Sequence, residues 1–297
     1  VNYTGKRWEL DDTGRIMRLA EETTADVFME AASENDTNRS EKLYKHAVRS
    51  ESAGSLHSMV TLASSEAGMS VPVGNFDKDH WKLNTANGLP FARKDLITKI
   101  CPVEYNPNAD SPIWDNFLHE ILQGRLDLIS FLYRYLGYSL TGSVREQKLL
   151  FCYGTGANGK STFLNTVQHM MGTYAKQAAP ELLVASKSGA RYMKQDFFEF
   201  LPTHKLWLAA NHKPIIKGND EGIWRRVLLV PFEVNIPEAK QDKNLESKLL
   251  GELPGILNRV VAGCLDWQRN GLNIPLSVKR ATQEYREELD LMKPFFD

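Results

Sequence analysis

The chain has 297 residues, enough for about two domains, and its 42% hydrophobic and 25% charged residues are ordinary for a globular protein. The 36 basic and 37 acidic residues give a net charge of −1, so the composition lacks an overall nucleic-acid-binding signature, although a locally basic cleft stays possible. Three cysteines lack metal-ligand spacing, and no apolar run approaches the ~20 residues of a membrane span. We expect reduced thiols and no membrane segment. Because the chain starts at Val1 rather than at methionine, we also expect a portion of a longer protein.

Residues 1–140 are predicted to form a mostly helical N-terminal domain. Residues 3–10 fit a short strand or hairpin, and amphipathic helices follow. Residues 73–112 are irregular because prolines and glycines interrupt them, although residues 97–105 fit a strand. Two further amphipathic helices are predicted over residues 113–140, the second ending at Gly137.

A glycine-rich stretch, GTGANGKS at residues 154–161, matches the phosphate-binding pattern G-x-x-x-x-G-K-[ST] at every fixed position. The apolar run before it, residues 149–153, reads as a buried strand, and residues 162–171 have helical spacing. A chance match in a glycine-rich turn is the alternative. The order of strand, loop and helix favours a nucleoside triphosphate site.

The chemistry of this loop assigns roles to its residues. Backbone N–H groups and the positive end of the helix dipole would hold phosphate oxygens. Lys160 would reach the β- and γ-phosphates, and Ser161 would ligate Mg²⁺. The expected ATP-binding set is Gly154, Thr155, Gly156, Ala157, Asn158, Gly159, Lys160, Ser161 and Thr162.

Two later apolar runs, residues 205–210 and 227–230, read as further strands of a parallel sheet that is covered on both faces. The first run ends at Asn211. A polar residue at the tip of a strand beside the phosphate loop can hold the attacking water and sense the γ-phosphate. Asn211 could equally cap its own backbone at a strand-to-turn junction, and spacing alone leaves both readings open.

Arg225 and Arg226 stand immediately before the second of these strands. Placed at a subunit edge, such an arginine could reach the γ-phosphate bound by a neighbouring subunit and stabilise transition-state charge. The alternative is a surface pair of arginines in ion pairs, for example with Asp220 and Glu221.

Three motifs together carry a resemblance to a known family: GTGANGKST, KLWLAANHKP and GIWRRVLLVPF. The chain resembles the superfamily 3 helicases, most closely the primase–helicases of phages, plasmids and large DNA viruses, including the C-terminal region of the poxvirus type. LNTANG, DLITKICPVEYNP and FLYRYLGYSLTG resemble the helical part that precedes the ATPase, and ELPGILNRVVAGCLDWQRNGL resembles the closing helices. The resemblance covers nearly the whole chain.

The resemblance implies an α/β fold, with an AAA+-like P-loop ATPase core at residues 141–235 between the helical domain and a helical segment at 236–297. It implies a homo-hexameric DNA helicase that uses ATP and Mg²⁺ to translocate on single-stranded and forked DNA. Replication proteins would be its partners, in the cytoplasm of a bacterial host or a virus-infected cell. By this analogy Asn211 is the sensor and Arg226 the arginine finger, with Arg225 in reserve.

One departure from the family concerns the stretch between the loop helix and Asn211. The family carries there a strand ending in acidic residues that hold Mg²⁺, and then a hairpin that grips DNA. Here a segment of this kind is missing near Gly189–Ala190, and a smaller gap is indicated near Gly88–Leu89. Either the sequence joins two parts of a longer chain, which we favour because both flanks look intact, or the protein is a degenerate ATPase.

DNA contacts follow only from a local excess of basic residues. Between Lys187 and Arg226 basic side chains outnumber acidic ones, which agrees with a basic pore lining but also with a solvated surface. The candidates are Lys187, Arg191 and Lys194. Two other functions stay open: a non-hydrolysing, ATP-binding oligomeric platform, and a P-loop small-molecule kinase.

Overall fold

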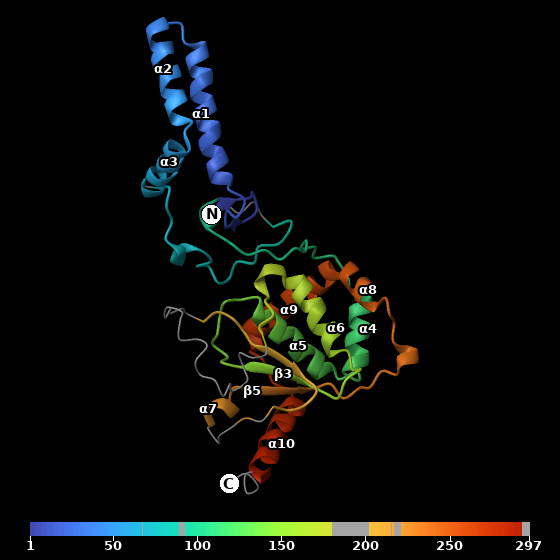
Figure 1. Cartoon of the computed structure of the whole chain (residues 1–297). Helices are drawn as coiled ribbons and strands as arrows, with labels where there is room; N and C mark the ends of the chain where they lie inside the picture. The colour runs from blue at the N-terminus through green and yellow to red at the C-terminus, as the bar shows by residue number, and fades with distance from the viewer. Residues whose placement is uncertain (67, 89–92, 180–201, 215, 217–220, 293–297) are drawn as a thin grey trace. The chain divides into compact units, whose positions relative to one another are not determined.

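The structure, a computed structural model, describes every residue except 67, 89–92, 180–201, 215, 217–220 and 293–297 (Figure 1). The chain divides into two compact units. The first comprises Val1–Lys78 and Pro90–Lys99, and the second comprises Asp79–Leu89 and Ile100–Asp297. No helix in the described part of the chain is long and apolar enough to cross a membrane.

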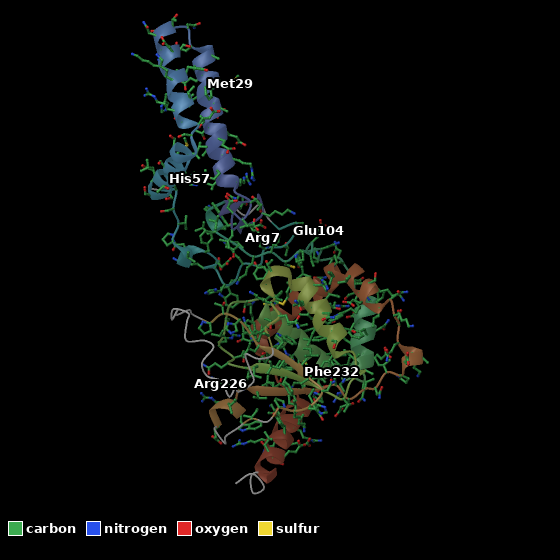
Figure 2. The ribbon with its side chains drawn as sticks, viewed as in Figure 1. Arg7, Met29, His57, Glu104, Arg226 and Phe232 are labelled. Carbon is green, nitrogen blue, oxygen red and sulfur yellow. The ribbon has the colours of Figure 1, made fainter. Side chains whose placement is uncertain are left out.

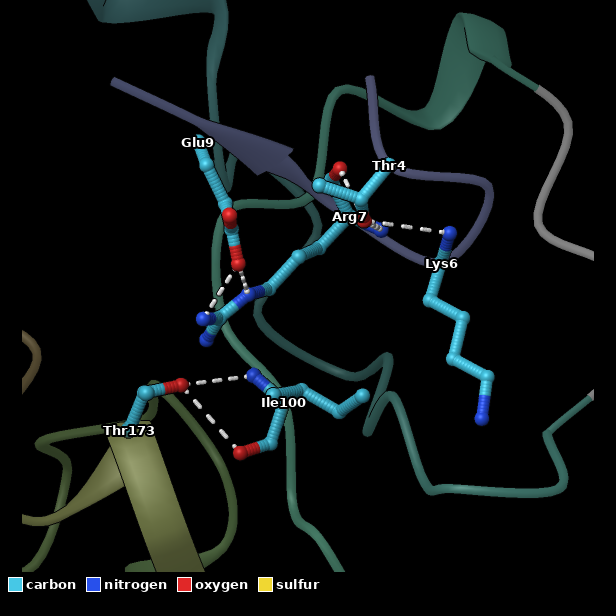
Figure 3. A network of polar contacts seen from close by, with 6 residues as sticks. All are labelled: Thr4, Lys6, Arg7, Glu9, Ile100 and Thr173. Carbon is cyan, nitrogen blue, oxygen red and sulfur yellow. Dashed lines mark hydrogen bonds and ion pairs between the residues drawn. The ribbon is translucent and has the colours of Figure 1, made fainter. Parts of the chain in front are cut away.

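The first unit is a small hairpin followed by three helices. Strands β1 (Asn2–Tyr3) and β2 (Trp8–Glu9) pair antiparallel, and Arg7 beside the turn forms an ion pair with Glu9 (Figure 3). The helices are α1 (Arg15–Ser33), α2 (Thr37–Ser50) and α3 (Ala53–Ser65). Asp36 and Ser52 accept hydrogen bonds from the first N–H groups of α2 and α3, which explains where these helices begin.

The strand predicted over residues 97–105 is absent; only an isolated bridge joins Thr85 to Cys101. The backbone groups of this segment bond elsewhere. The N–H of Ile100 donates to Thr173 Oγ1 at 2.7 Å, and its carbonyl accepts from the N–H of Thr173 at 3.1 Å (Figure 3). Pro102 supplies no N–H at all, which disfavours a paired strand. Short 3₁₀ turns occur at Val73–Asn75, Arg93–Asp95, Gly172–Tyr174 and Glu238–Lys240.

The large core of the second unit is formed mainly by helices, and α5 (Leu126–Ser139) contributes many of its buried residues. The others on this side are α4 (Pro112–Ile121), α6 (Lys160–Met171), α8 (Leu245–Gly251) and α9 (Leu253–Asn270). Gly137 does not end α5, contrary to the prediction. A Cβ there would lie 2.1 Å from the backbone nitrogen of Cys264 in α9, so this glycine permits the close crossing of the two helices.

A three-stranded parallel sheet lies in the second unit, in the order β4-β3-β5 among the described residues. The strands are β3 (Leu149–Tyr153), β4 (Trp207–Ala210) and β5 (Val227–Pro231). In register, Cys152 lies beside Ala209 of β4 and Val230 of β5. The predicted mixture of helices with a parallel sheet is confirmed.

Both faces of the sheet are covered. Leu150 and Cys152 of β3 join the large core with α4, α5, α6 and α9, whereas Phe151 points to the opposite face. There it packs with Leu229, with Trp224 of α7 (Glu221–Trp224) and with Tyr285 of α10 (Leu276–Met292). Figure 1 shows α10 beside β5, on the side of the sheet away from α4, α5, α6, α8 and α9. Burial on both faces explains why the strands read as continuous apolar runs rather than alternating ones.

Candidate functional site

The glycine-rich loop connects the carboxyl end of β3 with the first turn of α6, in the predicted order of strand, loop and helix. The chain just after β5 braces it. Phe232 N–H donates to the carbonyl of Tyr153 at 2.7 Å, and the Phe232 carbonyl accepts from Asn158 Nδ2 at 3.1 Å. Ile236 N–H donates to the carbonyl of Ala157 at 2.7 Å. The motif includes Asn158 only as a variable position, so spacing gave no sign of this bracing.

Lys160 is the first residue of α6 and is 5% exposed. Its ammonium donates to the Gly154 carbonyl at 2.7 Å, to Asn158 Oδ1 at 3.1 Å and to Asn211 Oδ1 at 3.3 Å. Burial lowers the pKa of this ammonium below its ordinary value. In the part of the chain that the structure describes, these three acceptors are neutral oxygens, so a phosphate at this loop would add a negative charge beside the buried cation.

Asn211 lies where the strand-end argument predicts. β4 runs parallel to β3 with Ala210 beside Tyr153, so the residue after β4 emerges at the same edge of the sheet as the loop. Asn211 is exposed to solvent, and its side-chain oxygen accepts the hydrogen bond from Lys160. The structure therefore brings together two site residues that are far apart in the sequence.

Ser161 and Thr162 follow Lys160 in the first turn of α6. Ser161 is exposed, and Thr162 is partly buried. The Ser161 hydroxyl is a suitable oxygen ligand for Mg²⁺, which prefers hard oxygen donors and keeps several waters. In the part of the chain that the structure describes, no group of three or more His, Cys, Asp or Glu side chains could hold a metal ion. Ser161 is thus the residue of this turn that we expect to contribute a ligand to a magnesium ion.

Arg225 and Arg226 lie at the other edge of the sheet. Val227 pairs with Leu149 and Pro231 with Tyr153, so the arginines stand at the amino ends of the strands. Figure 2 labels Arg226 and Phe232, the residues that flank β5. Five strand residues at about 3.3 Å each put about 16 Å between the arginine backbone and the loop of the same chain. That distance exceeds the length of an arginine side chain.

Both arginines are exposed, and their backbone is fixed. The Arg226 carbonyl accepts from the N–H of Leu149 at 2.9 Å, and the Arg225 carbonyl accepts from Lys148 Nζ. Among the described residues Glu221 pairs with Arg286 at 3.4 Å and with neither Arg225 nor Arg226. Arg225 and Arg286 line a pocket of about 250 Å³ with Glu221, Gly222, Trp224, Thr282 and Gln283.

Lys187, Arg191 and Lys194, the DNA-contact candidates, lie outside the described residues. So do Gly189–Ala190, where the missing segment is expected, and Asp220, the alternative partner of the arginines.

Comparison with known proteins adds evidence at the level of family. Residues 1–123 match the family described as D5 N terminal like. A protein of Acanthamoeba polyphaga mimivirus named "Putative helicase L207/L206" is 24% identical over 296 residues, which covers 74% of this chain and 30% of the viral protein. "Putative helicase 022R" of Frog virus 3 (isolate Goorha) is 22% identical over 228 residues, covering 56% of this chain and 23% of that protein.

The chain spans less than a third of the length of these two relatives. The first alignment extends over 296 residues yet covers 74% of a chain of 297, so the mimivirus protein contributes residues without a counterpart here. Such extra residues agree with the expectation of a missing segment. Together the comparisons show that residues 1–123 resemble the D5 N terminal like family and that the chain resembles two viral proteins named as putative helicases.

Proposed function

We propose that this chain is the ATP-hydrolysing motor of a hexameric, superfamily 3 DNA helicase that acts in the replication of a virus, phage or plasmid. The observation that carries the proposal is the contact between Lys160 Nζ and Asn211 Oδ1 at 3.3 Å. It joins the phosphate-binding loop to the tip of the neighbouring strand. A lysine with a polar side chain at that place is what γ-phosphate binding and sensing require.

In this proposal each loop residue has a chemical task. The N–H groups of residues 154–161 and the start of α6 bind the β- and γ-phosphates, and Lys160 neutralises them. Ser161 ligates Mg²⁺, which neutralises developing charge when bound. Asn211 exchanges its bond with Lys160 for the attacking water or a γ-phosphate oxygen. Thr162 completes the ATP-binding set behind Ser161.

Arg225 and Arg226 could contact a bound nucleotide only if a second subunit held it. Because Arg225 and Arg226 stand about 16 Å from the loop of their own chain, each can serve only a nucleotide held by a neighbour. In a closed ring with a repeated heterologous interface, the edge that carries the loop of residues 154–161 in one subunit faces the edge that carries Arg225 and Arg226 in the next subunit. An arginine supplied in trans accelerates phosphoryl transfer by roughly 10³–10⁵-fold. We assign Arg226 as the arginine finger, and Arg225 is the second candidate for this role.

DNA is the proposed polymer substrate. Single-stranded DNA would pass through the ring, with Lys187, Arg191 and Lys194 near its phosphates, and a fork would be unwound as the ring advances. The competing function is a ring that binds ATP without hydrolysing it. A small-molecule kinase is less well supported, because it has no use for exposed arginines at the edge opposite the loop.

The test is ATP turnover by the purified chain with and without single-stranded DNA. We expect turnover that DNA stimulates, and a loss of about 10²-fold or more in Lys160→Ala, because the main phosphate cation is removed. Lys248→Ala is the control, since Lys248 pairs with Asp242 on an exposed surface. Wild-type activity in Lys160→Ala would contradict the site, and tight ATP binding without turnover in the wild type would favour the platform.

A further inference from the structure

Helix α10 contacts the segment that carries Asn211. It covers the second face of the sheet, where Tyr285 packs with Trp224 and Leu229. Thr282 Oγ1 accepts from the N–H of Leu229 at 3.0 Å, which fixes α10 along β5. The next turns of α10 reach the chain just after β4, at the loop edge of the sheet.

Lys213 makes the first contact, two residues after Asn211. Its Nζ lies 2.7 Å from both carboxylate oxygens of Glu288. The same ammonium stands 5.2 Å from the ring centroid of Tyr153 and 5.6 Å from that of Tyr285. Tyr153 is the residue immediately before the phosphate-binding loop. The Lys213 side chain is 20% exposed and the Glu288 side chain is 58% exposed, so the lysine end of this pair is shielded while the carboxylate faces solvent.

Tyr285 makes the second contact. Its hydroxyl donates a hydrogen bond to the carbonyl of Pro214. Burial raises the pKa of this hydroxyl to about 12, so it keeps its proton as a donor throughout the neutral range. Lys213 and Pro214, adjacent in the chain, are therefore held by Glu288 and Tyr285, which lie about one helical turn apart on one face of α10.

We propose that α10 positions Asn211 for the γ-phosphate, with Lys213, Glu288 and Tyr285 as positioning residues that never touch the nucleotide. The inference rests on the proposed ATPase function. Asn211 is exposed, and among the described residues its side chain bonds to Lys160, a contact that a bound phosphate would replace. At that moment the position of Asn211 depends on the residues that follow it. Lys213 and Pro214 fix that segment to a helix that itself is anchored on the sheet.

The size of the effect follows from how sharply phosphoryl transfer depends on geometry. A displacement of about 1 Å in a positioning group can lower a rate by about 10²-fold. Because Lys213 and Glu288 hold the segment by mutual attraction, a pair with exchanged charges should restore that attraction, while the contacts of the Lys213 ammonium with the two tyrosine rings are lost. A Lys213 that instead binds a phosphate directly would not tolerate exchange for a carboxylate.

The test is a charge exchange: Lys213→Glu, Glu288→Lys and the double variant, with kcat for ATP and the Kd of a fluorescent ATP analogue measured separately. We expect each single variant to lose about 10- to 100-fold in kcat while its Kd changes by less than about threefold. The double variant should recover most of the lost kcat. The same exchange at Lys248 and Asp242, an exposed pair at 2.6 Å, is the matched control and should leave kcat unchanged.

Tyr285→Phe supplies a second variant that keeps the packing, and melting temperatures check that each variant folds. We expect it to lower kcat with little change in the Kd of the analogue. Unchanged kcat in the single variants and in Tyr285→Phe would overturn the inference, as would a double variant as slow as Lys213→Glu. No turnover in the wild type would overturn the proposed function itself, which is a distinguishable result.

Discussion

Replacing Gly159 by alanine tests the packing beneath the glycine-rich loop of residues 154–161. Gly159 has a φ of +77°, and a Cβ at this position would lie 2.5 Å from Ile121 Cγ2 and 3.1 Å from Phe117 Cε2. Ile121 and Phe117 are 0% and 3% exposed, so neither side chain can turn away into solvent. The absence of a side chain at Gly159 is therefore needed for core packing.

The magnitude has two parts. A left-handed backbone costs a non-glycine residue about 1–2 kcal/mol, and overpacking a filled core costs about 1–3 kcal/mol more. We expect Gly159→Ala to lower the free energy of unfolding by about 2–5 kcal/mol. Gly124→Ala is the control, because its φ of +68° is similar but its nearest neighbour, His119 Nδ1, is 3.4 Å away. This control should lose only the backbone part.

The assay is urea unfolding without nucleotide, followed by tryptophan fluorescence and by circular dichroism. Because no ligand is present, any difference between the two variants reports packing alone. Equal losses in Gly159→Ala and Gly124→Ala would refute the reasoning, since the contact with Ile121 would then contribute nothing. A Gly159→Ala protein as stable as the wild type would refute the backbone part as well.

Two more predictions concern the arginine edge and helix α1. Lys160→Ala and Arg226→Ala should each be inactive, yet an equimolar mixture of the two should regain about a quarter of wild-type turnover. In a randomly assembled ring, about a quarter of the interfaces join a subunit with an intact loop to a neighbour with an intact arginine. A mixture without activity would contradict an arginine finger that acts in trans. Bonds from the N–H groups of Ile16 and Arg15 lower the pKa of Asp11 to about 2, so its stabilisation of α1 is present at neutral pH and is lost as the pH falls through about 2. Carboxyl-carbon NMR titration measures this pKa, and a midpoint at the ordinary value of 3.8 would contradict it.

The sequence by itself determined the features that depend on short-range pattern. The spacing of glycines, Lys160 and Ser161 located the loop, because a phosphate cradle needs those residues at fixed offsets. Continuous apolar runs predicted buried parallel strands, and Asn211 could be placed because parallel strands end at one edge. Helical periodicity gave α4, α5 and α6 to within a few residues.

Tertiary structure alone decided which distant segments meet. Gly137 looked like a helix end, but the crossing of α9 over α5 makes it an interior residue. Residues 97–105 looked like a strand, but Thr173 takes the backbone bonds of Ile100. The bracing of Asn158 by Phe232 and the pairing of Lys213 with Glu288 join residues 74 and 75 positions apart. A local sequence pattern indicates the secondary-structure propensity of a segment. These long-range contacts depend instead on which surfaces are buried together, and that is decided only when the whole unit packs.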